Sequence, residues 1–341
     1  MASIIQKRSG LYFALLKLNG GEFRIGGVTC EDIALCKIDL KDERFRTSYH
    51  FNLDRLILSI RKAGLVSPPL VRRGKKRHVL VSGWKRVLAC RALGLTSINV
   101  LVTEDKNDLR LFLRALYENL ATREISLVEK AEIGRKLMGF GVDRTTLLRI
   151  YLPLLSLPAT SEHLEILLAL CGAGRAVKEF IWEKDVPLPV VQSLLRFAPV
   201  DRKALLPLLR PLGQNKQKEL LDDVWEISRR DNITVRKLLI DVGAPETLAS
   251  SKLSPQQKAE KIRRILKRKR YPRLSSYEDA FDSVRRKLRW PKDIALLPSP
   301  YFEDEDLFAS FRFKNKKEFS NKLAKLQEMG SKKEFSGLFN R

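Results

Sequence analysis

The sequence predicts an α+β protein of several domains: an α/β N-terminal domain, a mainly helical middle domain and a small α+β C-terminal domain. Its 341 residues suit two or three domains. Short apolar runs separated by glycine pairs open the chain, a leucine-rich helical pattern follows to about residue 243, and mixed strand and helix patterns return after a polar segment. With 44% hydrophobic and 31% charged residues, the chain has enough apolar side chains to fold.

The N-terminal domain is expected over residues 1–123. Its glycine-separated apolar runs predict two strands, at 11–18 and 33–40. Apolar residues at i, i+3, i+4 and i+7 from Leu53 predict a helix that Gly64 ends. The pattern then predicts, in order, a β-hairpin of 69–72 and 78–82, a helix over 84–93, a strand over 98–103, and a helix capped by Asn107 or Asp108 that ends near Asn119.

The helical middle domain is expected over residues 124–243. Ser126 and Glu129 form a capping-box pattern for its first helix, and seven prolines divide the rest into short helices. Small and polar residues over 244–256 are typical of a linker. A capping pattern at Ser254 predicts the helix that leads into the C-terminal domain, 257–341. Within that domain, two further helix starts are predicted at Ser275 and Asn315, and a half-buried strand is predicted over 307–313.

The charge of the chain predicts a polyanionic partner. Lys and Arg exceed Asp and Glu by 25, and the pI is near 10.0. Basic residues outnumber acidic ones by 23 to 11 over residues 1–123 and by 24 to 12 over 252–341, whereas the middle is nearly neutral. Because such ends gain free energy by releasing counterions from nucleic acid, double-stranded DNA is the first partner to expect, ahead of a membrane surface. A charge that serves only solubility is the alternative.

Membrane and disulfide-stabilised classes are not expected. No apolar run approaches the roughly 18 residues of a spanning helix, and the first ten residues lack the apolar stretch of a signal peptide. We therefore expect a cytoplasmic, nucleoid-associated protein without membrane contact. The four cysteines form no CxxC pair and no metal-ligand spacing with the three histidines.

A strand that leads directly into a helix is the first candidate for chemistry. In VLVSGWKR, residues 79–86, the strand passes through Ser82 and Gly83 into a helix whose first turn carries Lys85 and Arg86. Free backbone N–H groups at a helix start attract anions, and basic side chains are unfavourable there unless an anion neutralises them. The pattern predicts a bound phosphate, with a solvated basic turn as the alternative. Neither common glycine-rich nucleotide motif occurs in a fitting context.

From Lys37 to about Leu195 the chain resembles the ParB partition-protein family. Three blocks carry the resemblance, in the family's order and spacing. SIRKAGLVSPPLVRR (59–73) is similar to the cytidine-contacting block. GWKRVLACRALGL (83–95) is similar to the first phosphate motif, usually GERR, and ENLATREISLVEKA (118–131) to the second, usually ENxQR. The resemblance implies an N-terminal domain with the fold of sulfiredoxin, followed by helix-turn-helix DNA-binding helices.

The resemblance also implies a function. Members of the family bind CTP with Mg²⁺, and the nucleotide together with a centromere-like DNA site closes a dimeric clamp. Mg²⁺ takes one or two protein oxygens and leaves the rest to phosphates and water. Carried over to this sequence, the base would be contacted by Gly64 and Pro68, the phosphates by Gly83, Lys85 and Arg86, and Mg²⁺ or water by Glu118 and Asn119, with Glu118 as the candidate catalytic residue.

The departures from the family's motifs bear on catalysis. Trp84 stands where the first motif has Glu, Lys85 replaces an Arg, and Ala121 with Thr122 replace the Gln-Arg pair of the second motif. Lysine keeps the charge but loses the planar fork, and the missing arginine removes a donor. CTP binding with hydrolysis, binding without turnover, and loss of both stay open. Sulfiredoxin activity is excluded because SGWKR lacks the reactive cysteine.

A degenerate helix-turn-helix is predicted over residues 141–171, with a helix over 143–151, a turn through Pro158 and a second helix from Ser161. The second helix opens without Arg or Lys and carries carboxylates. A bundle that no longer reads sequence is the alternative. The candidate base-contacting residues are Thr160, Ser161 and His163, with Arg144, Arg149, Arg175 and Lys178 as basic compensation.

The run KIRRILKRKRYPR, 261–273, is a second candidate for DNA contact. On a helix it leaves a narrow apolar stripe and a broad basic face suited to phosphates, unless that face is merely solvated. The loop RRGKKRH, 72–78, is a third candidate. The basic face of the run consists of Arg263, Arg264, Lys267, Arg268 and Arg270.

Together these patterns predict a ParB-like DNA-binding protein of chromosome or plasmid partition, acting as a homodimer and gated by CTP. A partition ATPase is a partner by family analogy only. The alternatives are a transcriptional or nucleoid regulator that needs no nucleotide, and a CTP-hydrolysing enzyme stimulated by DNA.

Overall fold

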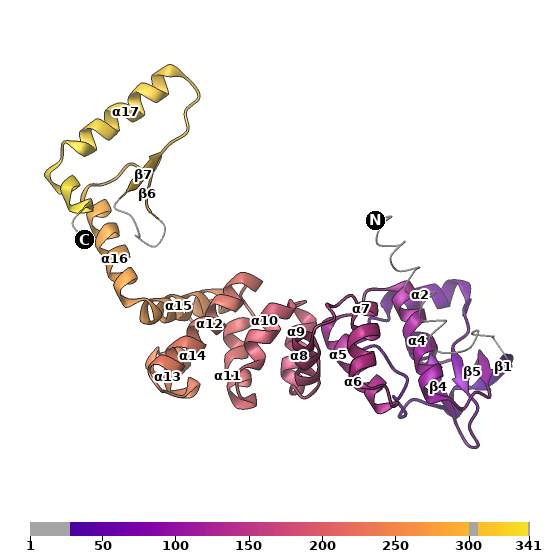
Figure 1. The fold of residues 1–341 in the computed structure, drawn as a ribbon. Helices are drawn as coiled ribbons and strands as arrows, with labels where there is room; N and C mark the ends of the chain where they lie inside the picture. Colours follow the sequence, from indigo (N-terminus) through magenta and orange to yellow (C-terminus); the bar gives the residue numbers. More distant parts are fainter. Residues whose placement is uncertain (1–27, 300–305, 340–341) are drawn as a thin grey trace. The chain divides into compact units, whose positions relative to one another are not determined.

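The computed structural model describes residues 28–299 and 306–339 (Figure 1). Contacts divide the chain into two compact units, residues 1–203 and 204–341. The predicted fold class is confirmed: an α/β domain comes first and the remainder is mostly helical. The strand expected over 11–18 lies outside the described residues. No helix in the described part of the chain combines the length and apolarity needed to cross a bilayer.

The N-terminal α/β domain is built on a five-stranded mixed sheet in the order β1-β5-β3-β4-β2. The expected hairpin is present as antiparallel β3 and β4, and β1 pairs antiparallel with β5, whereas β5 with β3 and β2 with β4 are parallel. The strands are β1 (Val28–Ala34), β2 (Ile38–Asp39), β3 (Leu70–Arg72), β4 (His78–Ser82) and β5 (Ser97–Thr103).

The single strand expected over 33–40 is wrong. The short 3₁₀ helix η1 (Leu35–Lys37) interrupts it, so that residues 33 and 34 end β1 and residues 38 and 39 form β2. β1 and β2 lie at opposite edges of the sheet, and the chain must therefore leave the sheet between them. Alternation of apolar residues cannot indicate that crossing.

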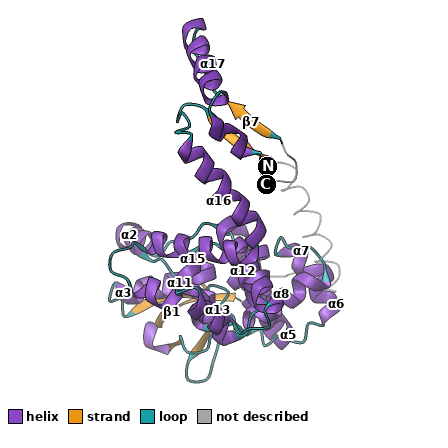
Figure 2. Cartoon of the chain, turned by 90° about the vertical axis from the view of Figure 1, so that its left-hand side faces the viewer, coloured by secondary structure: helices purple, strands orange, loops and turns teal. Residues whose placement is uncertain are grey.

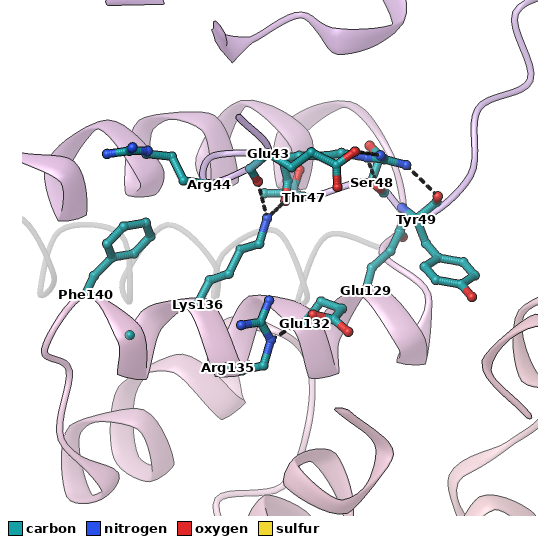
Figure 3. Close-up of a pocket in the computed structure, with 12 residues that line it drawn as sticks. Glu43, Arg44, Thr47, Ser48, Tyr49, Glu129, Glu132, Arg135, Lys136 and Phe140 are labelled. Carbon is teal, nitrogen blue, oxygen red and sulfur yellow. Dashed lines mark hydrogen bonds and ion pairs between the residues drawn. The ribbon is translucent and has the colours of Figure 1, made fainter. Parts of the chain in front are cut away.

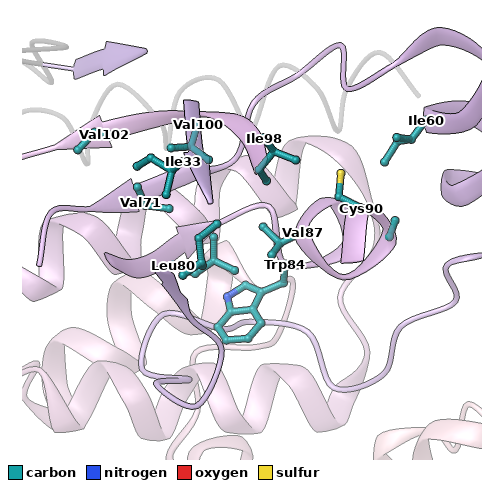
Figure 4. Packing of buried hydrophobic residues seen from close by; sticks show 12 residues of the cluster. Ile33, Ile60, Val71, Leu80, Trp84, Val87, Cys90, Ile98, Val100 and Val102 are labelled. Atoms are coloured by element: carbon teal, nitrogen blue, oxygen red, sulfur yellow. The ribbon is translucent and has the colours of Figure 1, made fainter. Parts of the chain in front are cut away.

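Three helices accompany the sheet: α2 (Asp54–Ala63), α3 (Trp84–Ala92) and α4 (Asp108–Thr122). α2 ends at Gly64, whose φ of 72° favours glycine. The Asn107 side chain caps α4 by accepting from the Arg110 N–H, and α4 continues past the expected end at Asn119. Strand residues such as Leu80 and Val100 pack with Val87 and Cys90 of α3 in one buried cluster (Figure 4).

The rest of the first unit is helical. α5 starts with the predicted capping box of Ser126 and Glu129. The first helix of the predicted helix-turn-helix begins after the Asp143 cap, passes through the π-helical turn η2, and ends at Leu154 rather than Tyr151. The helices are α5 (Leu127–Gly139), α6 (Arg144–Thr146), η2 (Leu147–Tyr151), α7 (Leu152–Leu154), α8 (Ser161–Cys171), α9 (Arg175–Glu183) and α10 (Leu188–Leu195). α11 (Pro199–Leu209) spans the boundary between the units.

The second unit opens with a helical part. Residues 244–256, expected as a linker, contain α14, because Ala244 and Thr247 are buried against the neighbouring helices. This corrects the linker interpretation, and the three domain ranges stay predictions. The Ser254 capping box starts α15 as predicted. The helices are α12 (Gln214–Arg230), α13 (Val235–Asp241), α14 (Ala244–Ala249) and α15 (Pro255–Arg270).

The end of the second unit has a two-stranded sheet between helices (Figure 2). Ser275 does not start a helix: it is buried inside α16, which begins at Pro272, a residue suited to a first helical turn. Asn315 caps α17 as predicted. The strand expected over 307–313 ends at Ser310, where its pairing with β6 stops. The elements are α16 (Pro272–Lys287), β6 (Ala295–Pro298), β7 (Leu307–Ser310), α17 (Lys316–Gly330) and η4 (Lys333–Leu338).

Candidate functional site

Gly83 forms the junction between β4 and α3, and only glycine fits there. Its φ of 90° lies in the left-handed region, and a Cβ at this position would lie 2.7 Å from the Pro69 Cβ and 2.9 Å from its Cα. The chain therefore turns sharply from strand to helix. The first N–H groups of α3 are left without helical carbonyl partners, as the sequence predicted.

A cavity of about 410 Å³ lies beside this junction, and we call it the Gly83 cavity. It is lined by residues of the loop before α2, of the β4–α3 junction and of the end of α4. The structure thus brings together the two segments that resemble the family's phosphate motifs. Of the predicted nucleotide-site residues, the lining includes Gly83, Lys85, Arg86, Glu118 and Asn119.

The Arg86 side chain makes four hydrogen bonds at the cavity. One guanidinium nitrogen donates to the Ser67 Oγ at 2.7 Å and to the carbonyls of Ser67 and Pro68 at 3.0 and 3.1 Å. The other forms an ion pair with Glu118. Three bonds to the 67–68 loop fix the position of the guanidinium, so that the Glu118 carboxylate occupies the direction in which a phosphate oxygen could bind.

Arg123 also lines the cavity, and the motif comparison missed it. It lies one residue after Thr122, where the family's second motif has Arg, so a guanidinium does enter the cavity from the adjacent position. Its Nε donates to the Asn119 Oδ1 at 3.0 Å, and its terminal nitrogens donate to the Glu129 carboxylate at 2.8 Å and the Ser48 Oγ at 2.9 Å. The signal available in the sequence was the arginine directly after ENLAT.

The side-chain oxygens of the cavity could bind a metal ion only if their present hydrogen bonds and ion pairs were broken. Glu118 is paired with Arg86, and the Asn119 carboxamide is used at both ends, because its Nδ2 donates to the Ala115 carbonyl at 2.8 Å. No group of three or more His, Cys, Asp or Glu side chains that could hold a metal occurs among residues 28–299 and 306–339. If a phosphate group took over the ion pair with Arg86, the Glu118 carboxylate would be free to bind Mg²⁺ as its one protein ligand here.

The other predicted residues lie differently. Neither Gly64 nor Pro68 lines the cavity, although the Pro68 carbonyl accepts a hydrogen bond from Arg86. Trp84, at the position where the family has Glu, lines the cavity but packs in the core with 7% of its surface exposed. Figure 4 shows its ring beside Leu80 and Val87. Trp84, at the position of the family's glutamate, is therefore part of the hydrophobic core.

A second cavity, of about 600 Å³, lies between residues 43–49 and α5, and we call it the Lys136 cavity (Figure 3). The Lys136 ammonium reaches across it and donates to the carbonyls of Glu43 and Arg46. Burial lowers the pKa of Lys136 to about 8. Thr47 and Ser48 line both cavities, so the same stretch of chain forms a wall of each.

Glu129 lines the Lys136 cavity and also binds Arg123, which lines the Gly83 cavity. It is 4% exposed and completes the α5 capping box while it accepts from the Tyr49 N–H at 2.9 Å and from Arg123. A buried carboxylate is stable only when it is paired and hydrogen-bonded, and Arg123 supplies its counter-charge. Arg123 therefore carries a structural role in addition to its place in the Gly83 cavity.

The predicted DNA-contacting side chains of the helix-turn-helix are largely engaged within the unit. Thr160 and His163 bond to each other at the start of α8. Arg144 pairs with Glu165, and Arg175 and Lys178 pair with Glu179 and Glu132 at 2.7 Å each. In the described part of the chain, the exposed Arg149 forms no ion pair, and the side chain of the exposed Ser161 forms no hydrogen bond.

The basic run of α15 is likewise mostly paired with carboxylates. Arg270, with 17% of its side chain exposed, binds buried Asp223 at 2.8 Å and Glu226, both on α12. Arg263 binds Glu219 and Glu260 at 2.9 and 3.1 Å. Weaker, more exposed pairs join Lys267 to Glu278 and Arg268 to Asp279, and Arg264 alone of the five candidates has no ion pair with a described residue.

Comparison with known proteins places the first part of the chain. Residues 26–120 match the model of the ParB N-terminal domain. A probable chromosome-partitioning protein ParB of Campylobacter jejuni is 33% identical over 87 residues, which cover 25% of this chain and 31% of that protein. The match thus spans about a third of the relative's length.

Solved structures with low overall similarity are also ParB domains. A Pnob8-like ParB-N domain has a TM-score of 0.36 at 17% identity, over 57% of this chain and 89% of that one. Truncated Caulobacter crescentus ParB, complexed with CTP-γ-S, has a TM-score of 0.25 at 20% identity, over 52% and 97%. The same protein complexed to the centromeric parS site has a TM-score of 0.33 at 16% identity, over 56% and 98%.

Residues 26–120 are thus similar in sequence to the ParB N-terminal domain. The similarity to the ParB family lies in this first part of the chain.

Proposed function

We propose that the chain is a ParB-like DNA-binding protein of chromosome or plasmid partition, which takes CTP with Mg²⁺ in the Gly83 cavity and acts as a homodimer. One observation carries the nucleotide part. Gly83 and Arg86, from one segment, and Glu118 and Asn119, from another, surround a single cavity within the matched domain. The three sequence blocks similar to the family's nucleotide motifs support CTP as the ligand.

The cavity offers phosphate two guanidinium groups, those of Arg86 and Arg123, together with Lys85 and the free N–H groups of α3. Each guanidinium is already paired with a carboxylate, Glu118 or Glu129. We therefore propose an exchange: phosphate takes the place of Glu118 at Arg86, and the released carboxylate becomes a ligand for Mg²⁺. Whether Glu118 also supports hydrolysis is a separate outcome, measured as phosphate release from CTP.

The dimer proposal is supported by the small sheet of the second unit. Leu297 of β6 and Phe308 of β7 lie opposite each other, and both are more than half exposed. An isolated two-stranded sheet is marginally stable in water, and an apolar open face favours a covering partner. A second copy of the chain is the proposed cover, with a partition ATPase as a further proposed partner by family analogy.

Titration of CTP with Mg²⁺ tests the nucleotide proposal. Arg86→Gln should weaken CTP binding at least about tenfold, because a charge-assisted hydrogen bond contributes roughly 1.5–3 kcal/mol. Arg91→Gln, at an exposed position of the same helix, is the matched control and should bind like wild type. Equal affinities of the two variants would remove Arg86 from the site.

Duplex binding measured against salt tests the DNA proposal. Affinity for random-sequence duplex should fall linearly on logarithmic axes, because each neutralised phosphate releases counterions. A flat dependence would reject DNA as the partner. A nucleotide-independent regulator, the alternative, would bind duplex equally with and without CTP.

A further inference from the structure

A short segment of the second unit, outside the regions considered above, has a higher density of basic residues than α15. Residues 285–292, RRKLRWPK, contain five basic residues and no acidic one. They comprise the last turn of α16 and the chain directly after it. We call this segment the 285–292 cluster.

The chain turns within the cluster at a residue in an unfavourable backbone conformation. Arg289 has a φ of 53° and follows the C-cap Leu288. Its N–H donates to the Arg286 carbonyl, and the Trp290 N–H donates to the Arg285 carbonyl, as in the common glycine-ended helix terminus. This backbone conformation is unfavourable for a residue with a Cβ, so glycine would be more stable than arginine at this position.

The turn arranges four basic residues around one hollow. A cavity of about 530 Å³ is lined by Arg285, Arg286, Arg289 and Lys292, together with apolar residues of the turn and of β6. Trp290 forms part of this lining, and its indole Nε1 donates to the Ile294 carbonyl at 2.8 Å. The indole also packs against the buried cluster of Phe281, Leu288 and Leu296. The floor of the hollow is therefore rigid.

These cations have few internal partners. Among the described residues, the one ion pair of the cluster joins Arg285 to Asp282 at 3.2 Å, and both side chains are about half exposed. Arg286 donates only to the Asp282 carbonyl, at 3.2 Å, and Asp293 pairs with Lys322 and Lys325 instead of Lys292. Like charges this close repel one another, and an external anion would relieve the repulsion.

We propose that the 285–292 cluster is a site for the phosphate backbone of duplex DNA. The proposal rests on the proposed DNA-binding function and locates one contact of that function. Arginine forks suit phosphate geometry, and such contacts add affinity without sequence preference. A membrane surface is the less fitting occupant, because Trp290, the aromatic residue of the cluster, is tied to the backbone and the core and is not available for insertion.

Arg289→Gly in the full chain separates this role from folding. The variant should unfold at a temperature no lower than wild type, because glycine relieves the positive φ. Its affinity for a short random-sequence duplex should nevertheless fall about eightfold at about 0.1 M salt, and its salt slope should fall by about 0.9, as expected for one lost phosphate contact. Arg236→Gln removes one exposed charge from α13 and is the matched control, expected to bind like wild type.

The outcomes distinguish this proposal from the one on which it rests. Salt-dependent binding by wild type, with equal affinity of Arg289→Gly and Arg236→Gln, overturns the cluster alone. Absence of salt-dependent binding by wild type overturns DNA binding itself. The triple variant Arg286→Gln, Arg289→Gly, Lys292→Gln is also sedimented with phosphatidylcholine–phosphatidylserine vesicles. Loss of vesicle binding with unchanged duplex affinity would assign the cluster to a membrane and overturn the proposal.

Discussion

The basic run of α15 and the 285–292 cluster resemble each other in sequence but differ in what their side chains contact. Four of the five candidate residues of α15 are paired with carboxylates, and Arg270 is held against buried Asp223. In the described part of the chain, the 285–292 cluster has one half-exposed ion pair. The difference shows that the number of basic residues in a run overestimates how many of them can bind an external anion, because carboxylates of the same chain already neutralise some of them.

Carboxylates of the chain also neutralise the arginines of the Gly83 cavity. Arg86 and Arg123 are both present there, yet each has an internal carboxylate. Phosphate must therefore displace an existing partner in this cavity, whereas at the 285–292 cluster it would meet guanidinium groups that face solvent. Four substitutions test this distinction.

Arg270→Met should have the largest effect, a loss of about 3 kcal/mol in the free energy of unfolding. Removing one partner of a buried pair leaves the other charge uncompensated, and burial already raises the pKa of Asp223. Urea unfolding measures the loss. The double variant Asp223→Leu, Arg270→Met should recover much of it, because no buried charge remains. Wild-type stability with a lower salt slope of duplex binding would instead make Arg270 a DNA contact and reverse the comparison.

Glu118→Gln should raise the affinity for pyrophosphate without Mg²⁺ about fivefold, because Arg86 loses its competing carboxylate, a partly exposed pair worth up to roughly 1 kcal/mol. The affinity for CTP with Mg²⁺ should fall, since a metal ligand is lost. Titration calorimetry with and without Mg²⁺ separates the two effects. Unchanged pyrophosphate affinity would show that the ion pair does not compete with phosphate.

Lys136→Met tests a cation that is paired with carbonyls. Its pKa of about 8 in the folded chain lies below the unfolded value of roughly 10.4, so the unfolded chain binds more protons between these values. The lysine's contribution to stability therefore rises with pH through this range. The destabilisation of Lys136→Met relative to wild type should grow by about 1 kcal/mol between about pH 8.5 and 9.5. A pH-independent difference from urea unfolding would contradict the lowered pKa.

Arg268→Gln should have the smallest effect, within about 0.5 kcal/mol of wild type, because its pair with Asp279 is more than half exposed on both sides. Thermal unfolding measured beside Arg270→Met sharpens the contrast within one helix. A loss as large as that of Arg270→Met would mean that exposure does not separate the two arginines.

Local sequence patterns predicted much of the first unit. The hairpin, the helix after Gly83 and the caps at Asn107 and Ser126 are present where they were expected. Two predictions were wrong at places where contacts between residues distant in the sequence determine the secondary structure. The interrupted strand near residue 35 reflects the sheet order, and α14 forms because Ala244 is buried against its neighbours. Neither the sheet order nor the burial of Ala244 can be recognised from the neighbouring residues in the sequence.

The sequence alone determined the strand-to-helix turn at Gly83, the caps and the net charge of the chain, because these depend on backbone conformation, neighbouring residues and composition. Only the tertiary structure decided which cations keep their charge available. The carboxylates that neutralise Arg86, Arg123 and Arg270 are on other turns or other helices. Ion pairing depends on distances of a few ångströms between such elements, and folding sets those distances.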